Sequence, residues 1–218
     1  DGAGLLYGVQ TLCQMVEQKG ALIPGVMVRD YPEIARRGYY LDQTRGRVLK
    51  LEELKQIADR LCRYKINEFQ LYVEHTYLFR DLSEMWRDTT PLSAEEILDL
   101  DEYCMERHIE LVPSLASFGH LYMLLSTKSH EELCELPDAS AQPFSFWDRM
   151  RHHTVNVSDD RTLPFIKKML EEYMALFRSE RFNLCADETF DLGKGRSAKL
   201  AEEKGIHRIY VDYLKELC

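Results

Sequence analysis

The feature of this 218-residue sequence that most constrains its fold is a repeated alternation of short apolar runs with amphipathic stretches. Four of the apolar runs lead into polar or glycine-containing residues, and we expect them to be β-strands: Gly38–Asp42, Asn67–Glu74, Glu110–Ser114 and Phe182–Asp187. Strands that alternate with helices favour a parallel sheet with helices outside it. The pattern therefore predicts an α/β fold, either a doubly wound sheet or a TIM barrel.

Helical spacing of apolar residues predicts the helices that separate these strands. An amphipathic helix is expected to open the chain, with apolar residues from Leu5 to Val16 and a stop at Gly20. A second helix has the apolar stripe Leu51, Leu54, Ile57, Ala58 and Leu61. Ser93 and Glu96 form a capping-box signature that predicts the start of a third, and Leu163–Phe177 predicts a fourth. The stretch Leu133–Asp160 exceeds ordinary loop length, so we expect a functional excursion or a short helical insert there.

Polar side chains at the ends of the expected strands favour the barrel, because barrel enzymes gather their chemistry at the C-terminal ends of the strands. Such side chains follow all four strands: Asp42, Arg45, Glu74, His75, His120, Asp187 and Glu188. No GxGxxG or Walker loop follows the first strand. We therefore predict a (β/α)₈-type TIM barrel of which only about the first four βα units are present. Residues 1–32 would be a lead-in helix and linker from a preceding α+β domain, and 33–218 the partial barrel.

Composition limits the classes of partner. The formal net charge of −9 comes from acidic residues spread along the chain, without a basic patch for nucleic acid. No apolar run approaches the length of a membrane span. The six cysteines include no CxxC pair, so neither a zinc site nor a disulfide framework is predicted. Buried free thiols favour a reducing compartment such as the cytoplasm, although the start without Met leaves localisation undetermined.

The segment NLCADETF contains the strongest chemical signal, because an apolar strand ends there in two adjacent carboxylates. Neighbouring side chains on a strand point to opposite faces, so Asp187 and Glu188 can reach one ligand only if the strand ends and turns. An isolated pair of this kind also fits a turn cap beside a solvated charge. The residues alone leave both interpretations open.

Several ordered motifs resolve this choice through a family resemblance. NLCADETF resembles the catalytic segment of glycoside hydrolase family 20, the β-N-acetylhexosaminidases, in which the strand usually ends Gly-Gly-Asp-Glu. YGVQTLCQ, IPGVMVRDYP, RRGYYLDQTR, RYKINEFQLYV and VPSLASFGH resemble further family segments in the same order. The resemblance covers nearly the whole chain. It implies cleavage of terminal β-linked N-acetylhexosamine, either GlcNAc or GalNAc, from glycans or glycoconjugates.

The resemblance also implies a substrate-assisted retaining mechanism, in which the 2-acetamido oxygen of the sugar attacks the anomeric carbon. Asp187 would orient the acetamide and stabilise the oxazolinium intermediate, and Glu188 would protonate the leaving oxygen and then activate water. Arg45 would grip sugar hydroxyls, and no cofactor or metal is implied. His120, His75 and Glu74 are further substrate-site candidates. A partial barrel alone is expected to be inactive and to require the rest of the barrel, or an oligomeric partner.

The sequence departs from the family pattern at three places. Cys185 and Ala186 replace the two glycines, Ala116 replaces an acid before Gly-His, and Glu74-His75-Thr76 replaces an acidic pair. A non-catalytic carbohydrate-binding barrel is one alternative. The other is a metal-dependent hydrolase with His75, His120 and Asp187 as ligands. The loop aromatics Trp86, Phe146 and Trp147 could contact a sugar but fit loop packing better.

Overall fold

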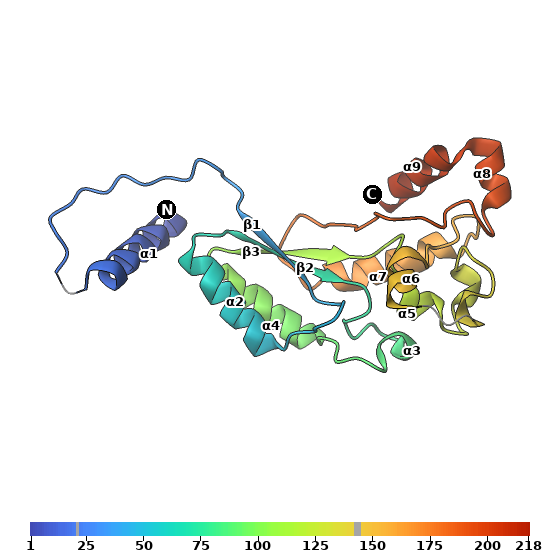
Figure 1. Cartoon of the computed structure of the whole chain (residues 1–218), viewed down its shortest axis with the longest axis horizontal. Coiled ribbons are helices and arrows are strands. Elements are labelled where there is room, and N and C mark those ends of the chain that lie inside the picture. Colours follow the sequence, from blue (N-terminus) through green and yellow to red (C-terminus); the bar gives the residue numbers. More distant parts are fainter. Residues whose placement is uncertain (21, 142–144) are drawn as a thin grey trace.

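A computed structural model describes residues 1–20, 22–141 and 145–218 and contains a parallel sheet of order β1-β2-β3 (Figure 1). The strands are β1 (Gly38–Asp42), β2 (Glu68–Val73) and β3 (Glu110–Leu115). Tyr40 of β1 lies opposite Gln70 of β2, which lies opposite Val112 of β3. The predicted α/β class and parallel sheet are confirmed, and the three strand predictions differ from these bounds by at most one residue at either end.

The two faces of the sheet differ in chemistry because successive side chains alternate along each strand. One face presents apolar residues such as Phe69, Leu71 and Leu111, which are buried in the core. The other face presents Glu68, Gln70 and Tyr72 from β2, with Glu110 and Ser114 in register on β3. One face therefore packs against helices, and the opposite face presents polar groups.

The apolar face is covered by helices that the sequence predicted. Helices α2 (Leu51–Arg63) and α4 (Ala94–Met105) lie side by side against it (Figure 1). In α4 the predicted capping box is present, since Ser93 Oγ accepts from the Glu96 N–H and Glu96 accepts from the Ser93 N–H. Helix α7 (Thr162–Met174) corresponds to the predicted Leu163–Phe177 helix, and its Tyr173 is fully buried.

The fourth predicted strand, Phe182–Asp187, is only partly correct. Asn183 pairs with β3 through a single parallel bridge, in which its N–H donates to Pro113 O at 2.9 Å and its carbonyl accepts from Leu115 N at 3.1 Å. The Asn183 side chain then accepts the Cys185 N–H at 3.1 Å, and Cys185 has a φ of 45°. This local turn withdraws the Cys185 backbone from the ladder, so the segment leaves the sheet before the two carboxylates.

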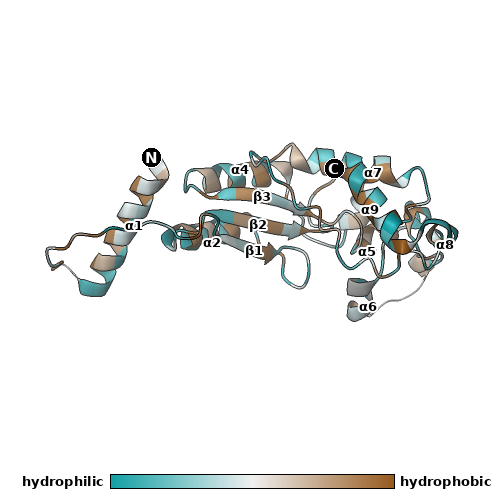
Figure 2. Cartoon of the chain, turned by 90° about the horizontal axis from the view of Figure 1, so that it is seen from above, coloured by the Kyte–Doolittle hydropathy of each residue, from teal (hydrophilic) through white to brown (hydrophobic). Residues whose placement is uncertain are grey.

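Figure 2 shows the three strands pointing one way, with α1 at their blunt end and the later helices beyond their arrowheads. Helix α1 (Gly2–Lys19) ends at Gly20, as the sequence predicted. Its apolar residues Leu5, Val9, Leu12 and Val16 are exposed, so the amphipathic pattern is present without cover from the described residues. Within the described residues, no helix has the length and apolar character that crossing a membrane requires.

The stretch Leu133–Asp160, where we expected an excursion or a short helical insert, contains the short helices η2 (Ala139–Ala141) and α6 (Phe146–Arg151). The excursion begins earlier than predicted, since α5 (Tyr122–Leu125) and η1 (Glu131–Leu133) also follow β3. Residues 142–144 of the excursion lie outside the described residues. Three further helices were not predicted: α3 (Ser83–Trp86) follows β2, while α8 (Ala198–Lys204) and α9 (Ile206–Leu217) follow the carboxylate segment. Ile209 and Tyr213 are four residues apart, a helical spacing of apolar residues that was an available sequence signal for α9; both are buried in the structure.

Candidate active site

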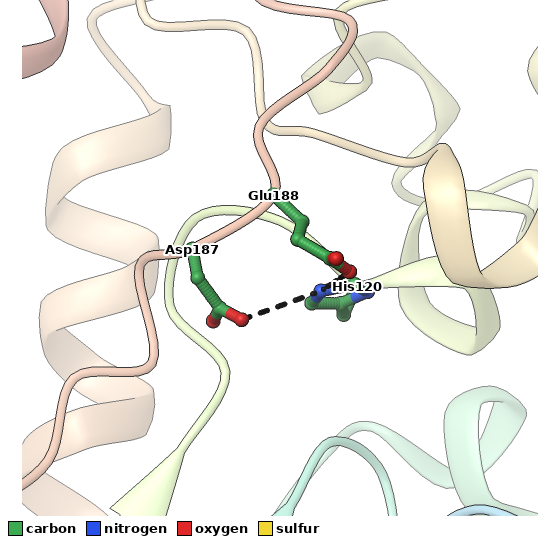
Figure 3. Close-up of side chains that lie close together, drawn as sticks. All are labelled: His120, Asp187 and Glu188. Atoms are coloured by element: carbon green, nitrogen blue, oxygen red, sulfur yellow. Dashed lines mark ion pairs between the residues drawn. The ribbon is translucent and has the colours of Figure 1, made fainter.

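Three of the predicted site residues meet beyond the C-terminal ends of β3 and of the Asn183 segment (Figure 3). His120 Nε2 lies 3.2 Å from Glu188 Oε2 and 4.0 Å from Asp187 Oδ2. The imidazole is almost fully buried, whereas both carboxylates are open to solvent. The turn after the fourth segment thus brings both carboxylates to one point, as the sequence argument required.

The backbone of this cluster is held in an uncommon conformation. His120, Cys185 and Glu188 have φ values of 59°, 45° and 49°, in the left-handed region that disfavours side chains. Each such residue costs on the order of 1–3 kcal/mol and persists only where the surrounding structure holds it in place. Five other non-glycine residues of the described chain also have positive φ, but here the conformation falls on two residues expected to do chemistry, His120 and Glu188.

The two loops that bear the cluster are in direct backbone contact. A Cβ added at Gly119 would lie 2.8 Å from Asp187 O and 3.4 Å from Glu188 O, so only glycine fits. Ser117 Oγ donates to Leu184 O at 2.6 Å, which is a second link between the same loops. The spacing between His120 and the carboxylates is therefore set by contacts on both sides of the turn.

The excursion is tied to the segment after Glu188 through Asp191. This buried carboxylate contacts His152 Nδ1 at 2.7 Å and accepts the His153 N–H at 3.0 Å. Burial lowers the pKa of His153 to about 4. Asp191 was not among the predicted site residues, and its only sequence signal is its position three residues after Glu188.

Arg45, Glu74 and His75 form a second group at the ends of β1 and β2. Arg45 Nε donates to Asp42 Oδ2 at 2.7 Å and lies 3.8 Å from Glu74 Oε1, and its guanidinium lies over the Tyr72 ring at 5.0 Å. Among the described residues, neither terminal nitrogen of Arg45 has a hydrogen-bond partner. The guanidinium is thus fixed along one edge and has its other donors available to a ligand.

Glu74 is nearly buried beneath this arginine and accepts a hydrogen bond from Tyr72 Oη at 2.9 Å. Burial raises the pKa of Glu74 to about 7, against the opposing effects of Tyr72 and Arg45. The charges of Asp42 and Asp187 contribute to this raised pKa, so the two groups of site residues influence each other electrostatically. His75 Nδ1 lies 3.9 Å from Glu74 Oε2, too far for a hydrogen bond, and burial lowers the pKa of His75 to about 4.

A third cluster on the polar face lies between these groups and was not predicted as such. Ser114 Oγ lies 3.0 Å from Cys185 Sγ and donates to Tyr40 Oη at 3.3 Å, and the Cys185 thiol is 3.8 Å from that same oxygen. Burial raises the pKa of the Cys185 thiol. Asp42, Tyr72 and Ser114 are paired across the three strands. Because side chains alternate along each strand, this pairing could have indicated which of them share the polar face.

A cavity of about 1000 Å³ adjoins the second group and is lined by Arg45, Glu74 and His75 together with residues of the excursion. Arg149 lines it from α6 and lies over the Tyr122 ring at 4.4 Å. Phe146 also lines it, and Trp147 is exposed beside Phe146. Trp86 donates its indole N–H to Phe79 O, which is the loop-packing role that the sequence favoured.

The ligand set of the metal-dependent alternative does not come together. Across the described ranges, the one group of three or more histidine, cysteine or acidic side chains with ligand atoms within 4.8 Å is His120, Asp187 and Glu188. His75 is not in it. The proposed His75, His120 and Asp187 site is therefore wrong as a ligand set.

The raised pKa of Glu74 predicts a pH-dependent stability. Because its pKa is about 7 in the folded state and 4.5 in the reference state, the folded protein binds more protons between these values. Stability contributed by this group is therefore fully present below pH 4.5 and is lost as the pH rises through 7. Urea unfolding of the full-length protein should show Glu74→Gln gaining on the order of 3 kcal/mol relative to wild type between pH 5 and pH 8. The exposed control Glu102→Gln should show no such change, and equal behaviour of the two variants would contradict the burial argument.

The sequence profile of the glycosyl hydrolase family 20 catalytic domain matches residues 35–209. The chain belongs to glycosyl hydrolase family 20. It is 25% identical over 210 residues to a beta-hexosaminidase of Porphyromonas gingivalis, covering 85% of this chain and 26% of that protein. It is also 25% identical over 223 residues to a beta-hexosaminidase of Vibrio furnissii, covering 86% and 34%. This family 20 chain thus spans about a quarter to a third of these relatives.

Solved family 20 structures have the same fold over nearly the whole chain. A chitobiase of Flavobacterium johnsoniae superposes with a TM-score of 0.78 at 21% identity, covering 98% of this chain and 34% of that one. The N-acetyl-beta-hexosaminidase of Streptomyces plicatus, solved in complex with Thio-NAglucal, gives 0.72 at 24% identity, covering 96% and 45%. The sequence resemblance to family 20 is therefore confirmed.

Proposed function

We propose that the full-length protein releases terminal β-linked N-acetylhexosamine from glycans or glycoconjugates by a substrate-assisted, retaining mechanism. The observation on which this rests is the convergence of His120, Asp187 and Glu188 at the strand ends of a family 20 domain. The names of the relatives, beta-hexosaminidase among them, support the same activity.

In this proposal the two carboxylates have separate tasks. Asp187 is solvent-exposed and next to the cluster, where its negative charge would orient the sugar 2-acetamido group and stabilise the positive oxazolinium formed from it. Glu188 would give its proton to the departing glycosidic oxygen and then take one from the attacking water. His120 at 3.2 Å would hold the Glu188 carboxyl in place for both steps.

Arg45, Glu74 and His75 would form the wall of the pocket that receives the terminal sugar. The terminal nitrogens of Arg45, which have no hydrogen-bond partner in the described part of the chain, form a planar pair of donors that suits two neighbouring sugar hydroxyls. Asp42 and Glu74 hold the other edge of the guanidinium. His75 lines the same cavity as a neutral ring and would contact the sugar as a donor or acceptor.

We further propose that residues 33–218 form part of a (β/α)₈ barrel and that residues 1–32 lead in from a preceding α+β domain. The polar face of the sheet supports this, because a barrel interior would enclose Tyr40, Tyr72 and Ser114 at its mouth. The remaining strands would come from the rest of the barrel or from an oligomeric partner. No cofactor is needed for the proposed reaction.

The full-length protein should cleave 4-nitrophenyl N-acetyl-β-glucosaminide or its galacto isomer and act far more slowly on the matching 2-hydroxy glycoside. Only the acetamide can supply the internal nucleophile. NMR should show the β-anomer as first product, and chelators should have no effect. Equal cleavage of the 2-hydroxy glycoside would contradict substrate assistance. Saturable sugar binding without cleavage would favour the carbohydrate-binding alternative.

A further inference from the structure

Helix α9 contacts both loops that bear the proposed catalytic cluster. Tyr210 and Tyr213 are three residues apart, so their side chains lie on one side of the helix. Tyr210 Oη donates to Ala186 O at 3.1 Å, and Tyr213 Oη donates to Ser117 O at 3.1 Å. One acceptor directly precedes Asp187 and the other lies three residues before His120.

The rings of the same two tyrosines hold Phe118. The Phe118 ring is stacked on Tyr210 at 5.4 Å and 15°, and it contacts Tyr213 at 4.3 Å between centroids. Phe118 is fully buried and directly precedes Gly119. Through Ser117, whose hydroxyl donates to Leu184 O, the helix, the loop after β3 and the carboxylate segment form one connected network.

We propose that Tyr210 and Tyr213 are positioning residues, which set the spacing between His120 and the Asp187–Glu188 pair. This inference rests on the proposed function. Neither tyrosine touches the reacting atoms. Each acts through a backbone carbonyl, and the Ala186 carbonyl belongs to the same peptide plane as the Asp187 N–H.

The left-handed turns explain why such positioning is needed. His120 and Glu188 are held at positive φ, a conformation that relaxes unless surrounding contacts oppose it. Gly119 leaves room for the close approach of the two loops. Among the described residues, however, its N–H makes no hydrogen bond to a carbonyl of the turn. The tyrosine hydroxyls supply two such donors from a helix, which is more rigid than a loop.

The Tyr210 and Tyr213 hydroxyls bind different loops, so their loss should affect catalysis to different extents. A role in overall stability alone would not predict such a difference. Loss of the Tyr210 hydroxyl frees the peptide plane that leads into the Asp187–Glu188 turn, so it should displace Glu188, the proposed acid–base, as well as Asp187. Loss of the Tyr213 hydroxyl frees Ser117, whose own hydroxyl still donates to Leu184 O. Tyr210→Phe should therefore have the larger catalytic effect, although both variants retain their rings against Phe118.

The test uses three variants of the full-length protein: Tyr210→Phe, Tyr213→Phe and the control Tyr103→Phe. Tyr103 Oη donates to Asp59 between α4 and α2, the helices on the apolar face of the sheet, so its loss removes a tyrosine hydroxyl that contacts neither site loop. For Tyr210→Phe we expect kcat to fall roughly tenfold with KM almost unchanged, and to fall further for glycosides with poor leaving groups. Tyr103→Phe should keep the wild-type kcat, KM and leaving-group dependence.

Hydrogen exchange measured by mass spectrometry supplies a readout that does not depend on activity. Tyr210→Phe should speed exchange in the peptide that contains 184–190, and Tyr103→Phe should not. If the wild-type protein fails to cleave, the proposed function is wrong. Faster exchange of 184–190 in Tyr210→Phe would still show that Tyr210 holds the carboxylate segment in place. If wild type is active and Tyr210→Phe matches Tyr103→Phe in kcat, leaving-group dependence and exchange, the positioning role is overturned.

Discussion

Replacing Glu188 with Gln in the full-length enzyme should slow cleavage of glycosides with poor leaving groups far more than that of nitrophenyl glycosides. The variant keeps the shape of the side chain near His120 but has no proton to donate. An alkoxide leaves only when it is protonated, whereas nitrophenolate departs with little assistance. We therefore expect a leaving-group dependence much steeper than that of wild type, measured over a series of aryl N-acetyl-β-glucosaminides.

Replacing Asp187 with Asn should fail in a different way. It removes the charge that would stabilise the oxazolinium-like transition state, and that charge is needed whichever group departs. The loss should be on the order of 10²-fold or more for good and poor leaving groups alike, as for other preorganised electrostatic contacts. A thiazoline mimic of the cyclic intermediate should bind wild type tightly and Asp187→Asn weakly.

A matched control separates these effects from a general loss of charge. Glu102→Gln neutralises an exposed carboxylate of α4, and it should leave both the rates and the thiazoline affinity unchanged. If Asp187→Asn and Glu188→Gln show the same leaving-group dependence, the division of roles is wrong. A conventional retaining glycosidase with an enzyme nucleophile would then fit better.

The sheet could be predicted from sequence because its signals are local. Each of β1, β2 and β3 is a short apolar run that ends in polar residues, and the helices between them have apolar stripes and, before α4, a capping box. The positions of Arg45, Glu74 and His120 at the strand ends followed from the same alternation. The family motifs then identified Asp187 and Glu188 as the pair of interest.

The parts that could not be predicted depend on side-chain contacts between distant segments. The fourth strand shortens to a bridge because the Asn183 side chain takes the Cys185 N–H, and apolar periodicity does not reveal such competition. The Cys185 contact with Ser114 joins residues 71 positions apart. The partner of Arg45 could not be predicted either. Asp42 and Glu74 both stand at strand ends in the sequence, and only the side-chain conformations show that Asp42 accepts the hydrogen bond.

Gly119 is the backbone position where a single methyl group should have a large effect. A Cβ at this residue would lie 2.8 Å from Asp187 O, closer than real Cβ atoms come to backbone. The obstacle is main chain, so the loop after β3 or the carboxylate turn has to move by several tenths of an ångström or more. Either movement changes the spacing between His120 Nε2 and the Glu188 carboxylate, now 3.2 Å.

We expect Gly119→Ala to lower kcat/KM of the full-length enzyme by about 10²-fold, because catalytic groups misplaced by around 1 Å lose that much. Overpacking should also cost about 1–3 kcal/mol of stability, which thermal unfolding would measure. Gly8→Ala is the matched control, since a Cβ there meets nothing within 4 Å. In the middle of α1 it should add roughly 0.5–1 kcal/mol of helix stability and leave activity unchanged.

Tyr210 and Gly119 act on the same turn, so their variants should not be independent. Tyr210→Phe relaxes the Ala186 carbonyl, and a relaxed turn can move away from the new methyl group at position 119. The double variant should therefore lose less activity than the two single losses combined, with a coupling on the order of 0.5–3 kcal/mol, as between other residues that share a contact. Wild-type activity in Gly119→Ala would show that the turn yields without moving the carboxylates, and the close approach at Gly119 would then have no part in placing them.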